Sequence, residues 1–128
     1  MIYHDETIRE TSKKKVMGWL VCVEGEEMGS DYRLVSGYNW VGKSQDMDIR
    51  IDGDSIADHY HCAIVYDEKH NTAFLVPQEG YPVSHNGETI SQPVPIIDQD
   101  RIGIGQLAFC FVAFCQGDRT WKNIAEES

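Results

Sequence analysis

The stretch that decides the fold is NWVGKSQDMDIRIDGDSIADHYH, residues 39–61. It contains two polar loops, each lying between short apolar segments, and these loops hold a Gly-Lys-Ser, a Gly-Asp-Ser and a His-Tyr-His sequence. Residues 47–52, MDIRID, alternate apolar and polar side chains, which is typical of a half-buried β-strand. Loops held by a stiff β framework are where binding residues are usually found. We therefore expect this stretch to present a binding edge.

Further short apolar segments lie on both sides of this stretch. They cover residues 19–23, 32–35, 61–66, 73–76, 102–104 and 107–114. In the last segment Leu107, Phe109 and Phe111 share one face of the expected strand. Asn86-Gly87 predicts a tight hairpin, because a type I′ turn needs positive φ at both central residues. Many short strands without helical periodicity predict an all-β sandwich.

The length of 128 residues fits one domain with a single core. We expect a polar N-terminal tail at residues 1–15, a β-domain at residues 16–115 and a C-terminal flap or tail at residues 116–128. The first segment lacks the apolar region of a secretory signal, and no run of about 18 apolar residues is present to cross a membrane. A cytoplasmic location is the default expectation.

The composition disfavours several classes of function. The formal net charge is −10, which argues against nucleic acids and anionic membranes as partners, because these bind basic patches. The four cysteines include no Cys-x-x-Cys pair, so we expect reduced thiols rather than disulfides or a zinc site. The sequence contains no P-loop, nucleophile elbow or metalloprotease motif, and we expect neither enzymatic activity nor a cofactor.

Six short sequence features follow one another along the chain: Val41-Gly42-Lys43, Asp48-Ile49, His61, Asn86-Gly87, DRIGIG at residues 100–105 and FCF at residues 109–111. Their order resembles that of the forkhead-associated (FHA) family. The chain also resembles small bacterial FHA proteins in GWLVC at residues 18–22, HCAIVYD at residues 61–67 and FVAFC at residues 111–115. The resemblance implies that residues 16–115 form an FHA-like β-sandwich of about eleven strands. It also implies that loops at one edge bind a phosphothreonine peptide without catalysis.

The resemblance implies roles for individual residues of that edge. In the family an Arg and a Ser bind the phosphate, a His braces the loop from within, and an Asn holds the peptide backbone. Here Lys43 stands in place of the Arg, and Ser44 beside it offers a hydroxyl. Asn86, followed by Gly87, matches the peptide-holding Asn, while Gly42 and His61 match structural positions.

The family's Ser has no counterpart, and the alignment leaves either Ala57 or Asp58 at its position. Ala57 would lose a hydrogen bond that contributes ~1.5–3 kcal/mol to binding a charged group. Asp58 would set a carboxylate against the phosphate, a repulsion of about 4 kcal/mol at ~4 Å and an effective dielectric of ~20. We therefore expect a protein-interaction module with weakened or lost phosphothreonine recognition. The alternative is a working phosphothreonine reader in Ser/Thr kinase signalling that uses Lys43, Ser44 and Asn86.

A third hypothesis is a metal site. His59 and His61 form a His-x-His sequence, which in a strand points both rings to one face, and Asp58 or His85 would complete the ligands. We prefer the simpler interpretation, in which His61 has its structural role and His59 is an exposed residue of the binding edge. No metal is then expected. The identity of the protein or peptide partner and the oligomeric state are left open.

Overall fold

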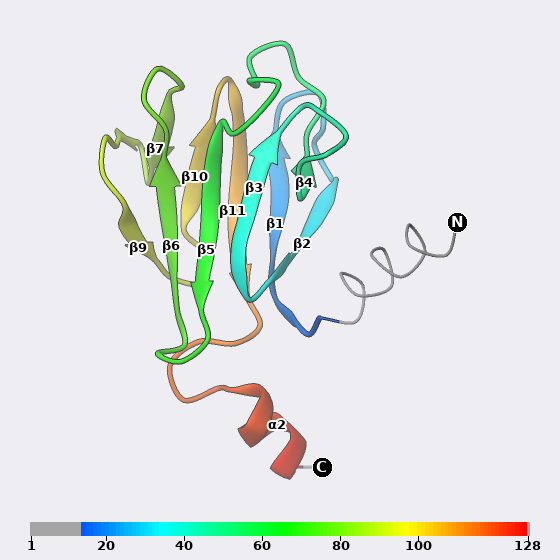
Figure 1. Cartoon of the computed structure of the whole chain (residues 1–128), viewed down its shortest axis with the longest axis vertical. Helices are drawn as coiled ribbons and strands as arrows, with labels where there is room; N and C mark the ends of the chain where they lie inside the picture. The colour runs from blue at the N-terminus through cyan, green and yellow to red at the C-terminus, as the bar shows by residue number, and fades with distance from the viewer. Residues whose placement is uncertain (1–13, 128) are drawn as a thin grey trace.

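The computed structural model describes residues 14–127, which form two packed β-sheets followed by a short helix (Figure 1). In spatial order the first sheet contains β2 (Asp31–Val35), β1 (Val16–Glu24), β11 (Leu107–Ala113), β10 (Arg101–Ile104), β7 (Val83–His85) and β8 (Glu88–Thr89). The second contains β4 (Ile49–Arg50), β3 (Gly37–Gly42), β5 (Cys62–Asp67), β6 (Thr72–Pro77) and β9 (Val94–Ile96). The predicted all-β sandwich of about eleven strands is confirmed.

The core lies between the sheets, where alternate side chains of each strand meet. Leu20 on β1 and Ile64 on β5 are completely buried there. The predicted inward face of β11 is confirmed, because Leu107, Phe109 and Phe111 are all buried and the residues between them are not. A period of two in the sequence thus identified one complete face of this strand.

Strand β3 points a polar residue inward and aromatic residues outward. Asn39 is buried, and its side chain is fully bonded. Its Oδ1 accepts from Val35 N–H at 3.0 Å, and its Nδ2 donates to the carbonyl oxygens of Val35 and Ile64, each at 2.9 Å. These bonds allow an amide in the core. Tyr38 and Trp40, which alternate with Asn39, consequently lie on the outer face.

The half-buried strand predicted at residues 47–52 is mostly loop. Only Ile49–Arg50 is a strand, and it pairs in parallel with β3. Met47 and Ile51 are nevertheless buried, as the alternating pattern indicated. The Asp48 carboxylate accepts the Trp40 N–H at 2.8 Å, so a side chain takes the place of a backbone pairing partner. The pattern identified the buried side chains but not the length of the strand.

The C-terminal segment packs on the sandwich more closely than the expected tail would. Trp121, the first residue of α2 (Trp121–Glu127), donates from Nε1 to Val16 O at 2.7 Å, and its ring lies 5.0 Å from that of Phe114. Asn71 Nδ2 donates to Gly117 O and Arg119 O at 2.8 and 3.0 Å, which fixes the preceding turn. The expected N-terminal tail lies almost wholly outside the described residues.

The four cysteines are all free thiols. Cys22, Cys62 and Cys115 are buried, and burial raises the pKa of the Cys62 thiol to about 12. Thiolates, not thiols, are the nucleophiles and metal ligands, so such a thiol is unreactive at neutral pH. Within residues 14–127, no helix has the length and apolar character needed to cross a membrane.

Candidate functional site

Four loops meet at the upper end of the sandwich as drawn in Figure 1. The loop after β3 is bonded to the loop before β5, because Lys43 N–H donates to Ala57 O at 2.9 Å and Ser44 N–H donates to Asp58 O at 2.8 Å. Further backbone and side-chain bonds join the remaining loops to these two. The four segments, called the loop edge below, are residues 43–48, 51–59, 78–82 and 105–106.

His61 lies beneath the loop edge and joins two of its segments. Its ring is completely buried; Ala57 N–H donates to Nδ1 at 3.0 Å, and Nε2 lies 3.0 Å from Pro82 O. Since Nδ1 must accept and Nε2 must donate, the ring is neutral with its proton on Nε2. Burial lowers the pKa of His61, and the bond to Pro82 opposes this only in part. The neutral ring therefore braces the loop before β5 against residues 78–82.

Gly42 lets the two main loops approach each other closely. A Cβ atom at this position would lie 2.7 Å from Asp58 O and 2.7 Å from Met47 Cγ. The first of these contacts is with backbone, which cannot move aside without disturbing the Ser44–Asp58 hydrogen bond. Any larger residue would force the loops apart, so the position before Lys43 requires glycine for steric reasons.

Both candidate phosphate donors already face carboxylates. Lys43 Nζ lies 3.8 Å from Asp58 Oδ1. The Ser44 side chain hydrogen-bonds to the exposed Asp46 carboxylate, and this bond, supported by His59, holds the pKa of Asp46 below its usual value. Of the two residues that could occupy the family Ser position, it is therefore the side chain of Asp58 that faces the cation.

The three histidines of the metal hypothesis have separate partners. His59 Nε2 lies 3.3 Å from Asp46 Oδ1, and His85 Nε2 lies 2.7 Å from Asp100 Oδ2. Both ring nitrogens of His61 are used by the backbone. Among residues 14–127, no three His, Cys, Asp or Glu side chains gather closely enough to hold a metal ion.

Asn86 and Gly87 lie away from the loop edge, in the hairpin turn between β7 and β8. Their φ angles of 50° and 91° are those of the predicted type I′ turn. Asn86 N–H donates to Arg101 O at the first residue of β10, whereas the loop edge begins after the last, Ile104. A rise of ~3.3 Å per residue separates the two ends of this strand by about 10 Å. The structure therefore does not bring Asn86 together with Lys43 and Ser44.

The Asn86 side chain also has partners within the fold. Its Oδ1 accepts from Arg101 N–H at 2.8 Å, and its Nδ2 donates to Asp100 Oδ1 at 3.2 Å. Partial burial opposes ionisation of Asp100, but hydrogen bonds from His85, the Ile97 N–H and Asn86 outweigh it and lower its pKa. This amide fixes the start of β10.

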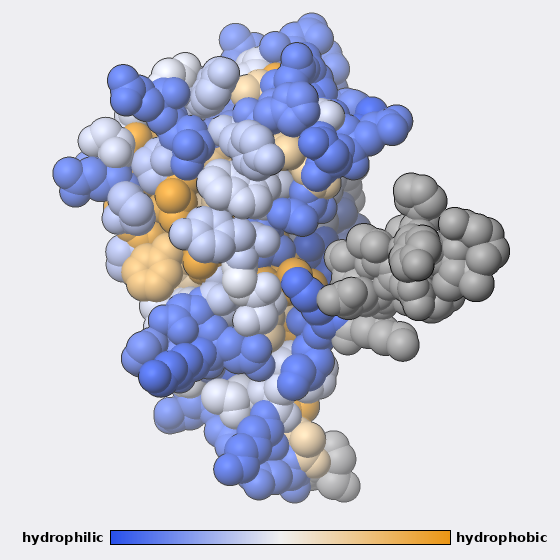
Figure 2. All heavy atoms as spheres, viewed as in Figure 1, coloured by the Kyte–Doolittle hydropathy of each residue, from blue (hydrophilic) through white to orange (hydrophobic). Residues whose placement is uncertain are grey.

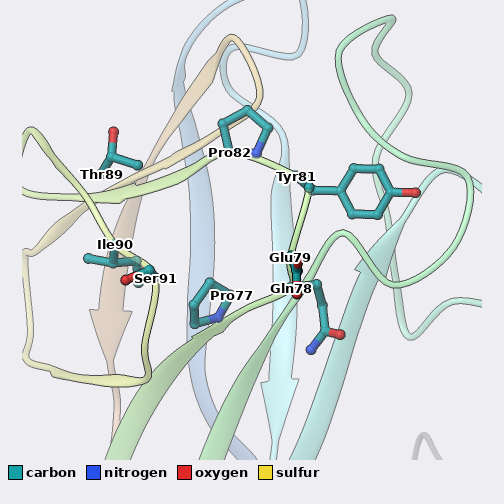
Figure 3. Close-up of a pocket in the computed structure, with 9 residues that line it drawn as sticks. Pro77, Gln78, Glu79, Tyr81, Pro82, Thr89, Ile90 and Ser91 are labelled. Atoms are coloured by element: carbon teal, nitrogen blue, oxygen red, sulfur yellow. The ribbon is translucent and has the colours of Figure 1, made fainter.

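Residues 78–82 also form part of the loop edge, which the sequence did not predict. Pro82 O accepts from His61, and the exposed ring of Tyr81 lies 5.4 Å from the His61 ring. Beside them is an open groove of about 550 Å³, lined in part by Pro77 and Ile90. Figure 3 shows the Tyr81 ring pointing away from Ile90. The available signal was an aromatic residue between two turn formers, Gly80-Tyr81-Pro82.

A family comparison agrees with this architecture. The family model described as FHA domain matches residues 39–105, which is more than half of the chain. The matched segment runs from β3 to the turn after β10 and includes three of the loops in full. No curated protein matches the chain.

Several solved structures share the fold. The FHA domain of CT664 from Chlamydia trachomatis is 21% identical with a TM-score of 0.64, covering 75% of this chain and 96% of that one. The FhaA FHA domain, solved in complex with the intracellular domain of Rv3910, is 23% identical with a TM-score of 0.63, covering 73% and 98%. The cytoplasmic domain of the T3SS sorting platform protein PscD from P. aeruginosa is 17% identical with a TM-score of 0.63, covering 76% and 80%. At these identities the likeness establishes the fold.

Proposed function

The chain belongs to the FHA domain family, and on that premise we propose that it is a non-catalytic protein-interaction module with weakened or lost phosphothreonine recognition. The proposed contact residues are Lys43, Ser44, Asp58 and His59, joined by Tyr81. Two further residues, Gly42 and His61, hold the loops in place. The partner is a protein or peptide, in keeping with the net charge of −10.

The observation that carries this proposal is the pairing of Lys43 with Asp58. A phosphate that approached Lys43 would also approach the Asp58 carboxylate, 3.8 Å from the Lys43 ammonium. The repulsion is reduced by solvent, because the Asp58 side chain is 76% exposed. A lysine also lacks the flat two-pronged guanidinium that grips phosphate. A phosphate would therefore gain little at this edge.

A second candidate function is an ordinary phosphothreonine reader in Ser/Thr kinase signalling. It is favoured by the looseness of the same ion pair, since an exposed pair contributes at most ~1 kcal/mol. Lys43 can leave Asp58 at small cost and turn toward a doubly charged anion. In this case Ser44 would leave Asp46 and donate its hydroxyl to the same phosphate. The two candidates differ in whether phosphate increases affinity.

The test compares two peptide libraries that differ only in a fixed central phosphothreonine or threonine. Binding to the full chain is measured by fluorescence anisotropy. We expect wild type to bind the two libraries with affinities within about threefold of each other, a difference of less than ~1 kcal/mol. Asp58→Ser should favour the phosphorylated library by about tenfold, because it removes a carboxylate and supplies a hydroxyl donor.

Two further variants separate the contributions of the Asp58 charge and of Lys43 to the preference for the phosphorylated library. Asp58→Asn removes the charge without supplying a hydroxyl, so its preference should lie between those of wild type and Asp58→Ser. Lys43→Ala should change the affinities for the phosphorylated and unphosphorylated libraries by the same factor. A strong phosphate preference of wild type that Lys43→Ala abolishes would refute the leading proposal and establish the phosphothreonine reader.

A further inference from the structure

Three aromatic side chains form a row on the outer face of the five-stranded sheet, beside the loop edge. Tyr38 and Trp40 project from β3, and their rings stack with centroids 5.4 Å apart. Tyr60, just before β5, meets Trp40 edge-on at 5.0 Å. Tyr38 is 58% exposed and Tyr60 is 48% exposed. Tyr38, Trp40 and Tyr60 are called the aromatic row below.

The neighbouring strands extend this row into a wider apolar face. Tyr38 lies opposite Val65 on β5, and Val65 lies opposite Phe74 on β6; both of these residues are partly exposed. The five-stranded sheet faces the viewer, and Figure 2 shows pale and orange side chains over its middle between blue ends. Exposed aromatic and aliphatic side chains gathered on one face in this way are typical of interaction sites.

The backbone of Tyr60 is strained. Its φ is 54°, in the left-handed region that bulky side chains rarely adopt. Its N–H donates to the sulfur of Met47, at 3.3 Å, and sulfur is a weak acceptor. The following residue is held firmly, because His61 N–H donates to Val41 O at 2.8 Å. A strained residue that presents an exposed ring is the kind of outlier that occurs at binding sites.

Carboxylates border the aromatic row at its end near the loops. Asp48 accepts the Trp40 N–H at 2.8 Å. Asp46 lies 3.3 Å from His59, whose ring centroid is 6.1 Å from that of Tyr60. Residues 43–58 contain five aspartates against one lysine and one arginine, within a chain of net charge −10. Two carboxylates, Asp46 and Asp48, thus lie beside the row, and they favour a cationic ligand over an anionic one.

We propose that the aromatic row binds an arginine-bearing segment of a partner protein. A guanidinium stacks flat on Trp and Tyr faces, where the ring quadrupole attracts it, while its N–H groups reach neighbouring carboxylates. Uncharged residues of the same segment would lie over Val65 and Phe74. An acidic peptide would be repelled, as would a second copy of this chain with its own charge of −10. This surface is additional to the loop edge.

The test titrates the full chain against fluorescein-labelled hexaarginine, hexalysine and hexaglutamate at physiological salt, followed by fluorescence anisotropy. Hexaarginine should bind several-fold more tightly than hexalysine, because lysine lacks the planar group, and hexaglutamate should not bind. Tyr38→Ala and Trp40→Leu should each weaken hexaarginine binding by about fivefold or more. Neither variant changes the net charge, so the loss would report ring stacking rather than overall attraction.

Matched variants serve as controls. Met28→Ala also removes an exposed apolar side chain, in the turn before β2, and should bind hexaarginine like wild type. Asp46→Asn and Asp31→Asn remove the same charge, but only Asp46 borders the row, so Asp46→Asn should weaken binding more. Urea unfolding midpoints check that each variant is folded. Tyr38 has the most exposed ring of the row, so Tyr38→Ala should disturb the fold least and can carry the test if Trp40→Leu unfolds.

Three results would overturn the proposal. The first is equal hexaarginine affinity of wild type and Tyr38→Ala. The second is hexaglutamate binding as tight as that of hexaarginine. The third is self-association of the wild type that Trp40→Leu abolishes, without any hexaarginine binding, which would identify a second copy as the occupant.

Discussion

The loop edge and the aromatic row lie side by side, yet their side chains are used in opposite ways. At the loop edge, Lys43 faces Asp58, and the buried ring of His61 beneath it is bonded through both nitrogens. In the aromatic row, the rings of Tyr38 and Tyr60 contact other rings on one side and solvent on the other. At the loop edge the polar groups are paired with one another, whereas the aromatic row exposes ring surface to solvent.

This difference shows what a ligand must do in each place. A ligand at the loop edge has to displace a pair that already exists, whereas a ligand at the aromatic row only has to cover exposed rings. The contrast is sharpest between Tyr60 and His61, which are adjacent in the chain. One is half exposed in a strained conformation, and the other is completely buried and fully bonded.

The largest expected effect comes from breaking the internal bonding beneath the loop edge. His61→Ala should lower the free energy of unfolding by ~2–4 kcal/mol, because it leaves a cavity and orphans the Ala57 N–H and the Pro82 carbonyl. Urea denaturation measures this change. His61→Gln, which keeps volume and polar atoms, should lose less. A loss below about 1 kcal/mol in His61→Ala would mean that the loops are held by other contacts.

A smaller effect follows from protonating the same ring. Unfolded His61 takes up a proton near pH ~6.5, but burial lowers its pKa in the folded protein. Below about pH 6.5 the unfolded state binds more protons, so the free energy of unfolding falls as pH falls, by at most ~1.4 kcal/mol per pH unit, until the folded pKa is reached.

The measurement is urea unfolding of wild type and His61→Gln at several pH values between about 7.5 and 5.5, around the ordinary histidine pKa. All other titrating groups are shared, so the difference between the two proteins isolates His61. The stability of wild type should fall more steeply toward low pH. Parallel pH curves would show that the folded protein accepts a proton on this ring.

The smallest expected effect lies one residue earlier. Tyr60→Asn places a residue that tolerates positive φ where the chain already has it, while giving up the ring contact with Trp40. The two changes oppose each other, and we expect the free energy of unfolding to stay within about 0.5 kcal/mol of wild type. The same urea experiment checks this. A loss comparable to that of His61→Ala would remove the contrast between the two regions.

The sequence predicted the sandwich because its strands obey simple alternation. On β11 the buried Leu107, Phe109 and Phe111 alternate with less buried neighbours, as expected. The same rule fails on β3, where Asn39 points inward and Trp40 outward. Asn39 is accepted in the core only because Val35 and Ile64 supply backbone partners, and Ile64 is distant in sequence. The Ile64 partner is set by tertiary structure and has no local signal in the sequence.

The site was less predictable than the fold. Asn86-Gly87 is at once a hairpin signal and a match to a ligand-binding position, and the sequence does not decide between them. In the structure Asn86 lies in the hairpin turn, and its side-chain amide hydrogen-bonds to the Asp100 carboxylate and the Arg101 N–H. Likewise, that the Asp58 side chain faces Lys43 is seen from their distance of 3.8 Å, which alignment does not supply.

The bond between Trp121 and Val16 has a practical consequence for attachment. It holds the beginning of β1 against the beginning of α2, so the two ends of the folded part lie together (Figure 1). They lie at the far end of β11 from the turn at residues 105–106, about 20 Å along a strand of this length. A surface tether, a fluorophore or a fused protein joined at either end would leave the loop edge facing solution.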